Sequence, residues 1–228
     1  MKRTALIIVS LMLVSCAASA KGISLGFKAG VYTASTTEIP QGWGNSSFKS
    51  GFAGGVVVCD ATSDWFALQP EILYVMKGLG GGYSSRFGAV TLKGKFNYIE
   101  IPVLVRYTVQ TGNRVRPYLL LGPSLGISLD AKVDIEQVDP RTHATTTGSA
   151  DYSNVMSKTE FGFTFGVGCA CGIGRGDITL DGRFDLGLSK TFKGGDVNEV
   201  IGGRTTTTTV YAGNNKNIGF ALLVGYGF

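Results

Sequence analysis

The side chains that could do chemistry in this sequence are a serine in a hydrolase-like motif, a single histidine, and a set of charged residues inside apolar segments. Residues 122–126 read GPSLG, the GxSxG spacing that presents the nucleophile of many serine hydrolases. That motif works at a sharp turn between a strand and a helix, with a histidine partner elsewhere. Here Ser124 lies inside an alternating segment, 116–129, that predicts one uninterrupted strand. We therefore do not expect Ser124 to be a nucleophile.

The charged residues lie on the smaller or more polar face of alternating apolar segments. They are Glu71, Glu100, Arg106, Arg116, Asp181, Arg183 and Asp185. Charges that converge inside a membrane protein could line a path for protons or ions, or they could pair into an ionic plug. We predict that these seven residues form one polar network, and we predict no catalytic, metal or cofactor site among them.

The elements that must position this network are strands, of which the last is the clearest. The final nine residues, FALLVGYGF, place large apolar side chains on one face and small ones on the other. A half-buried strand of a soluble sandwich would show a polar second face, so this pattern is typical of a strand that faces lipid. An amphipathic strand that ends the chain on an aromatic residue resembles the closing strand of bacterial outer-membrane β-barrels. The resemblance implies that Tyr226 and Phe228 form the signal read by the barrel assembly machinery.

The same alternation predicts seven further strands and a regular order of connections. The eight strands are expected at residues 23–31, 51–61, 65–77, 95–109, 116–129, 160–173, 178–192 and 220–228. Long loops are expected at 34–50, 78–93, 130–157 and 193–216, and tight turns at 62–64, 111–113 and 175–176. An eight-stranded barrel with both termini in the periplasm needs three short turns there and four longer loops outside. The sequence supplies this order.

The polarity of the two faces decides between a membrane barrel and a soluble one. A lipocalin-type barrel places apolar residues inside, whereas a lipid-facing Lys or Arg costs ~2–4 kcal/mol near the bilayer midplane. The sequence therefore predicts an all-β fold, an eight-stranded antiparallel up-and-down transmembrane β-barrel with a polar lumen filled by side chains. A filled lumen favours the ionic plug over the ion path. Aromatic residues near strand ends fit the girdles of the two membrane interfaces: Tyr74, Tyr107, Phe192, Tyr226 and Phe228.

Turn lengths predict which residues face the charged groups. If the turn at 175–176 pairs Gly174 with Asp177, three charged residues face small ones: Asp181 faces Ala170, Arg183 faces Gly168, and Asp185 faces Gly166. A three-residue turn at 111–113 would set Arg106 opposite Tyr118 and Glu100 opposite Ser124. Large groups would thus face small ones, as a narrow lumen requires.

The first twenty residues predict export. They combine a basic start, an apolar run and a small-residue end, which is the pattern of a secretory signal peptide cleaved after Ala20. The box LVSC at 13–16 also fits lipoprotein processing, which would leave an acylated Cys16. Beyond residue 20 no apolar run is long enough to span a bilayer as a helix, and 21–228 suits a single barrel domain. The net charge of +5 is too small and scattered to predict nucleic-acid binding.

Several segments together resemble a known family. They are LQPEILYVMKG at 68–78, FNYIEIPVLVRY at 96–107, RPYLLLGPSLGISL at 116–129 and the closing strand. They are similar to the PorT-like outer-membrane β-barrel proteins common in Bacteroidetes. The resemblance implies an integral protein of the cell outer membrane, and one member of that family belongs to a protein-secretion and gliding apparatus.

The sequence leaves three functions open. The first is a non-enzymatic barrel that acts through its outer loops as a surface binding, adhesion or envelope-structural module. The second, implied by the resemblance, is a component of a secretion or gliding apparatus. The third is a lipid-modifying enzyme such as a lipid A deacylase that uses His143, although a lone histidine in a polar loop is usually solvated. Expected partners are outer-membrane lipid and lipopolysaccharide, the assembly machinery during insertion, and other envelope proteins; no cofactor is expected.

Overall fold

The structure, a computed structural model, describes residues 22–37, 47–85, 88–112 and 114–228. The predicted signal peptide, its cleavage point after Ala20 and the alternative acylation site at Cys16 lie outside these residues. The strands are β1 (Ile23–Thr36), β2 (Ser47–Ala61), β3 (Phe66–Ser85), β4 (Gly88–Thr108), β5 (Val115–Val138), β6 (Thr145–Asp151), β7 (Thr159–Ile173), β8 (Gly176–Gly187), β9 (Gly195–Ile201), β10 (Arg204–Val210) and β11 (Asn217–Gly227). In the described part of the chain, no helix is long and apolar enough to span a membrane.

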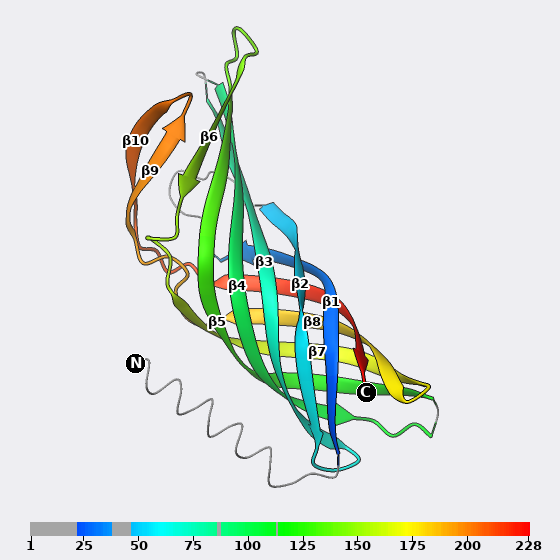
Figure 1. Ribbon diagram of the computed structural model, residues 1–228. Helices are drawn as coiled ribbons and strands as arrows, with labels where there is room; N and C mark the ends of the chain where they lie inside the picture. Colours follow the sequence, from blue (N-terminus) through cyan, green and yellow to red (C-terminus); the bar gives the residue numbers. More distant parts are fainter. Residues whose placement is uncertain (1–21, 38–46, 86–87, 113) are drawn as a thin grey trace.

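Eight of these strands form a closed antiparallel ring (Figure 1). The order is β1-β2-β3-β4-β5-β7-β8-β11, and β11 returns to β1. The closing pair runs from Gly26 opposite Gly227 to Thr36 opposite Asn217, and Leu25 and Phe228 exchange two backbone hydrogen bonds at its end. The predicted eight-stranded barrel is therefore confirmed, with the last strand closing it.

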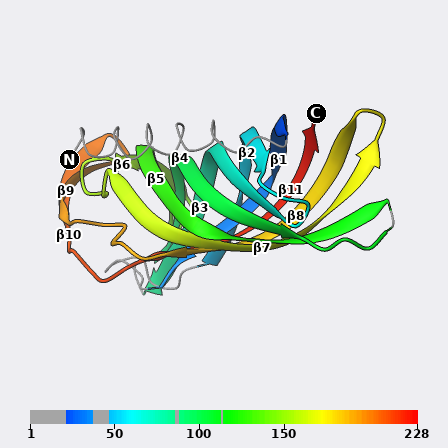
Figure 2. The same ribbon diagram turned by 90° about the horizontal axis from the view of Figure 1, so that it is seen from below.

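Three short connections join ring strands at one end, as predicted. They follow Ala61, Thr108 and Ile173, and they lie with the C-terminus at the end that we call the turn end. The far ends of β3, β4 and β5 lie with β6, β9 and β10 at the opposite end, which we call the loop end. Viewed from below, the β7–β8 turn and strands β9 and β10 lie on opposite sides of the molecule (Figure 2).

Three of the four predicted long loops are largely strand, so those loop boundaries were wrong. Residues 78–93 continue β3 and β4, which stay paired from Gly78 opposite Lys95 to Ser85 opposite Gly88. Residues 130–157 hold the rest of β5 and all of β6, and 193–216 hold β9 and β10. In the β5 part of these segments, Ala131, Val133 and Ile135 are buried and alternate with exposed charged residues. This arrangement is the reverse of a lipid-facing strand, and the backbone groups still pair with a neighbouring strand.

Strands β6, β9 and β10 extend the wall of the barrel beyond the loop end. β6 pairs with the far half of β5, β9 pairs with β6, and β10 pairs with β9. We call these three strands the extension sheet. Beneath it lies an apolar cluster, the loop-end core, made of Leu79, Leu92, Phe96, Tyr98, Ala131, Val133, Ile135, Ala150, Tyr152, Val155, Met156, Phe192, Val197 and Val210.

Phe192 belongs to this core and not to an aromatic girdle. β8 ends at Gly187, five residues before the predicted end, so Phe192 leaves the ring. Its side chain is fully buried and packs edge-to-face on Phe96, with 6.2 Å between ring centroids. The girdle assignment of Phe192 was wrong because alternation alone does not show where a strand leaves the membrane.

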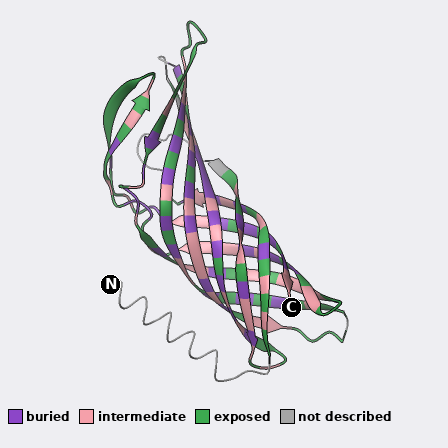
Figure 3. Ribbon diagram, viewed as in Figure 1, coloured by how far each residue is buried: buried purple, intermediate pink, exposed green. Residues whose placement is uncertain are grey.

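Residues alternate between more exposed and more buried along the ring strands (Figure 3). Large apolar side chains remain about half-exposed on the outer face, among them Phe27, Val31, Phe52, Val56, Ile72, Val105, Leu119, Leu121, Phe165, Val167, Leu180, Leu222 and Val224. Such a band, on a ring that has no open edge, is suited to contact with lipid chains.

Candidate functional site

The centre of the barrel holds a cluster of four buried charges, which we call the central ion cluster. Arg183 on β8 donates to both carboxylate oxygens of Glu71 on β3, at 2.6 and 2.8 Å, and to Asp181 Oδ2 at 2.6 Å. Lys28 on β1 donates to Asp181 Oδ2 at 2.5 Å and lies 3.4 Å from Glu71 Oε1. All four side chains are at most 5% exposed. Two cations therefore balance two anions, as buried charges require.

Glycines on β7 make room for this cluster. Arg183 lies opposite Gly166, where an added Cβ would come within 3.2 Å of Arg183 Cγ. Asp181 lies opposite Gly168, where an added Cβ would collide with the Tyr118 ring. Only glycine leaves space for these large groups on the facing strand.

The predicted register of this hairpin was wrong by two residues. The turn is Gly174–Arg175, and Ile173 pairs with Gly176. Asp185 therefore faces Thr164, which donates a hydrogen bond of 2.5 Å to it, and does not face Gly166. A shift of two keeps each side chain on the same face of the sheet, so the charged residues still point inward.

The register of the β4–β5 hairpin was also wrong by two residues. Glu100 lies opposite Gly126, and Arg106 lies opposite Leu120. Arg106 nevertheless reaches Tyr118 diagonally, with its Cζ 3.8 Å from the ring centroid. Arg116 is separate from the other charged groups and pairs with Asp177 at the turn end, where both side chains are 37% exposed.

A second group of charges, the upper acidic cluster, lies between the central ion cluster and the loop-end core. Lys77 donates to Glu100 at 2.7 Å and lies 4.0 Å from Glu160. Glu160 also accepts hydrogen bonds from Tyr98 at 2.8 Å and from Asn217 at 2.6 Å. Lys77, Glu100 and Glu160 line a small cavity with a volume of 30 Å³, and Asp185 lines it as well. Three carboxylates thus surround one ammonium group.

The structure brings the seven predicted network residues together only in part. Glu71, Asp181 and Arg183 share the central ion cluster, Glu100 and Asp185 lie in the upper acidic cluster, and Arg106 and Arg116 lie nearer the turn end. The prediction missed the two lysines and the third carboxylate, Lys28, Lys77 and Glu160. Lys28 and Lys77 share the smaller face of their strands with other inward residues, a signal that could have included them.

The motif residues considered first are not assembled into a reaction centre. Ser124 lies in the continuous strand β5, so residues 122–126 form no strand-to-helix turn. His143 lies at the exposed tip of the β5–β6 hairpin, with a φ of 55°. In the described residues, no group of three or more His, Cys, Asp or Glu side chains is arranged to hold a metal ion.

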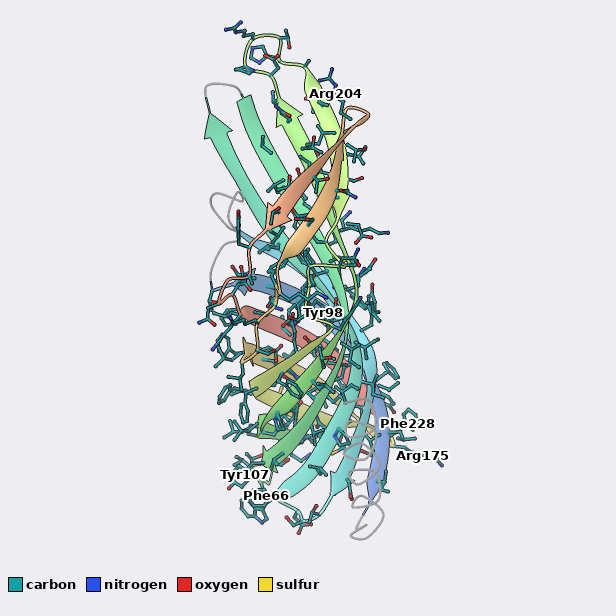
Figure 4. The ribbon with its side chains drawn as sticks, turned by 90° about the vertical axis from the view of Figure 1, so that its left-hand side faces the viewer. Phe66, Tyr98, Tyr107, Arg175, Arg204 and Phe228 are labelled. Carbon is teal, nitrogen blue, oxygen red and sulfur yellow. The ribbon has the colours of Figure 1, made fainter. Side chains whose placement is uncertain are left out.

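The predicted assembly residues lie on the outside of the closing strand. Tyr226 lies 6.2 Å from Phe27 and 6.3 Å from Phe228 between ring centroids, and Phe228 is 64% exposed. Figure 4 shows Phe228 near Arg175 at the turn end, with Phe66 and Tyr107 at the same end. Their role in assembly remains a prediction.

A closed antiparallel ring with an apolar exterior defines a transmembrane β-barrel. Residues 15–193, more than half of the chain, match the family described as "Outer membrane protein beta-barrel domain". The chain belongs to this family, and it is a protein of the outer membrane. No curated protein matches the sequence significantly.

Solved outer-membrane barrels have a similar arrangement of strands at low sequence identity. Neisserial surface protein A is 14% identical, with a TM-score of 0.48, and the alignment covers 91% of this chain and 96% of that one. OprG of Pseudomonas aeruginosa is 11% identical, with a TM-score of 0.48 and coverage of 92% and 98%. The protease OmpT of Escherichia coli is 10% identical, with a TM-score of 0.43 and coverage of 92% and 97%. We draw no functional conclusion from likenesses at these scores.

Proposed function

We propose that this protein is a non-enzymatic surface binding module in which the barrel is an anchor and the extension sheet is the binding part. The turn end faces the periplasm and the loop end faces outward, because short turns belong to the periplasmic side of such barrels. The observation that carries the proposal is that β9 and β10 form an ordered hairpin held above the lumen by a core of its own, the loop-end core.

The filled lumen favours a barrel that acts as an anchor and not as a channel. The central ion cluster and the upper acidic cluster lie across the ring, and the loop-end core lies above them. The cavity beside the upper acidic cluster measures 30 Å³, which is room for about one water molecule. The paired side chains fill the lumen beneath the extension sheet.

The hairpin presents a polar outer face. Its outward residues are all exposed: Asp196, Asn198, Val200, Thr205, Thr207 and Thr209. Thr207 donates to Asn198 at 2.9 Å and Thr209 donates to Asp196 at 2.7 Å, which orders these side chains. From the opposite face, Val197 and Val210 are buried in the loop-end core. The hairpin is therefore fixed on one side and available on the other.

The edge of β10 offers a second kind of contact. Within the described residues β10 pairs with β9 alone, so its other edge carries backbone N–H and C=O groups that no strand satisfies. Natural edge strands are often blocked by Lys, Pro or a bulge. Residues 205–209 are five threonines in an unshifted register. An open edge of this kind can accept an extended segment of another protein as an added strand.

The test compares whole cells that display the protein with cells that display two loop variants. One variant replaces residues 196–209 by a short Gly-Ser turn, and the matched control replaces the β5–β6 tip at 139–144. Binding of the cells to extracellular-matrix proteins, to host cells and to one another is measured. We expect binding that is lost with the hairpin and kept in the control. Unchanged binding without the hairpin would refute the proposal. It would also be refuted if the cells bind nothing while added protease cuts the loops, because the cutting shows that the loops are displayed at the surface.

Membership of a secretion or gliding apparatus is a second candidate. It is supported by the PorT-like resemblance of residues 68–78, 96–107 and 116–129. A deletion strain would then show impaired protein secretion or motility, and native electrophoresis would find the barrel in a large complex. Normal secretion together with a barrel of monomer size would exclude this candidate.

The lipid-modifying alternative depends on His143, whose exposed position offers it no enclosed pocket. We expect that His143→Ala leaves the lipid A profile unchanged, as measured by mass spectrometry of extracted lipid. A changed profile would favour the enzyme over the binding module.

A further inference from the structure

A cavity opens at the turn end, below the central ion cluster. It has a volume of 130 Å³, and we call it the vestibule. Its inner polar lining is Lys28, Cys59, Gln69, Arg106 and Thr179, and Asp177, whose carboxylate pairs with Arg116, also lines it. Arg175 and Phe228, which Figure 4 shows together at this end of the barrel, also line it. The vestibule is therefore a polar hollow that ends at the buried charges of the lumen.

Two cations that line the vestibule lack an acidic partner among the described residues: Arg175, which is exposed on the β7–β8 turn, and Arg106, which lies further inside. Among the described residues, no carboxylate oxygen lies within 4.0 Å of the Arg106 nitrogens, whereas Lys28, Lys77, Arg116 and Arg183 each have one. The Arg106 guanidinium lies over the Tyr118 ring and beside the Cys59 thiol. Its Nε is buried without a hydrogen-bond partner. The ring thus holds the guanidinium in place while part of its hydrogen-bonding capacity stays unused.

Thr179 supplies a second unused polar group in the same hollow. Its residue is 6% exposed, and its Oγ1 has no hydrogen-bond partner. The Tyr118 hydroxyl donates its proton to Asp181 and also interacts with Thr179, in a geometry too poor for a regular hydrogen bond. A buried hydroxyl that is satisfied so poorly keeps capacity for a better partner. Two independent groups, one charged and one neutral, therefore line the vestibule with unmet hydrogen bonds.

The groups around Arg106 point to the chemistry of its missing partner. Lys28 and Arg183 are balanced by Glu71 and Asp181, and Arg116 is balanced by Asp177. Arg106 has no carboxylate within 4.0 Å in the described part of the chain, although the buried Asp60 of β2 lies at the same end of the barrel. The guanidinium of Arg106 can only donate hydrogen bonds, so a partner that enters from the turn end must be an acceptor, and an anion is the strongest one.

We propose that the vestibule is a binding site for a small oxyanion, a phosphate or a carboxylate, that enters from the periplasmic side. Arg106 donates from its guanidinium edge to the anion, and the Thr179 hydroxyl donates to a second oxygen. Planar guanidinium groups match the oxygens of phosphate and carboxylate. The volume of 130 Å³ accommodates one such anion with a water molecule or two, taking about 30 Å³ per water.

The test uses the purified full-length barrel in detergent micelles, titrated with inorganic phosphate and with acetate at constant ionic strength. Calorimetry measures affinity, and the shift in melting temperature gives an independent readout. We expect a Kd on the order of 1 mM for at least one of the two anions. Preference for phosphate would point to a phosphate group as the natural ligand, and preference for acetate to a carboxylate group.

Two variants and a control keep the result specific. Arg106→Gln should weaken binding about tenfold or more, since it removes a charge-assisted hydrogen bond. Thr179→Val should weaken it about threefold to tenfold without changing the charge. Arg114→Gln removes the same charge from an exposed position at the same end and should leave binding unchanged. The shift of the folded band on heating shows that each variant has formed a barrel.

Two results would overturn the proposal. The first is that neither anion binds, which would mean that water alone fills the vestibule. The second is that Arg106→Gln and Thr179→Val bind the anion as well as the original protein does.

Discussion

Replacing Arg183 by methionine should cause a large loss of barrel stability. Arg183 donates three charge-assisted hydrogen bonds, two to Glu71 and one to Asp181, and its side chain is 2% exposed. Methionine fills similar space but carries no charge. The variant keeps two buried carboxylates, and Lys28 is then the one cation within 4.0 Å of them in the described part of the chain, so one buried negative charge has no counterpart.

The expected loss in free energy of unfolding is set by the uncompensated buried charge and not by the sum of the three lost hydrogen bonds. Removing one partner of a buried ion pair costs ~3–5 kcal/mol, whereas removing both partners together is often nearly neutral. Arg183→Met combined with Glu71→Gln leaves Lys28 and Asp181 as a balanced pair 2.5 Å apart. We therefore expect the double variant to recover most of the free energy of unfolding that the single variant loses.

The assay is equilibrium unfolding in urea of the barrel in lipid vesicles, followed by tryptophan fluorescence and by the mobility of unheated samples on a gel. Arg116→Met is the matched control, since its pair with Asp177 is 37% exposed and worth ~0–1 kcal/mol. The reasoning fails if the free energy of unfolding of Arg183→Met lies within about 1 kcal/mol of that of the original protein. It also fails if the double variant is less stable than the single one.

Three further changes test other parts of the structure. Gly168→Ala should destabilise the barrel by ~1–3 kcal/mol because the added Cβ meets the Tyr118 ring. Gly182→Ala should be neutral in the same unfolding assay, because its added Cβ approaches only the Val167 carbonyl oxygen, at 4.0 Å. Leu222→Arg, on the outer face of β11, should cost ~2–4 kcal/mol in vesicles, and an equal stability would contradict a lipid-facing position. Phe192→Ala should empty part of the loop-end core and cost ~3–5 kcal/mol, so that limited proteolysis cuts residues 193–216 faster while the ring stays intact; an unchanged cutting rate would count against that core.

For the charged residues, the local sequence pattern predicts the face of the strand but not the ion-pair partner. Arg183 and Asp181 were placed on the inner face of β8 by parity alone, and the structure has both of them buried. Their partners could not be predicted in the same way. Glu71 comes from β3 and Lys28 from β1, more than a hundred residues earlier in the chain, and closing the ring brings them together.

Strand register was the other feature that the sequence did not predict correctly. Both predicted hairpin registers were wrong by two residues, because they depended on the length assumed for each turn. A shift of two leaves every side chain on its own face, so parity gave no warning. The fit of Arg183 against Gly166, and of Tyr118 beside Gly168, selects the register that the structure has.

The sequence by itself determined the number of ring strands, the face on which each side chain lies, and the three short connections at one end of the ring. These follow from a period of two residues, which lipid outside and a narrow lumen inside impose on every membrane strand. Only the tertiary structure decided how far the strands continue beyond the membrane, that β9 and β10 form a hairpin, and which charges meet. Outside the bilayer no apolar alternation is required, and inside it the partners come from strands that become neighbours only when the ring closes.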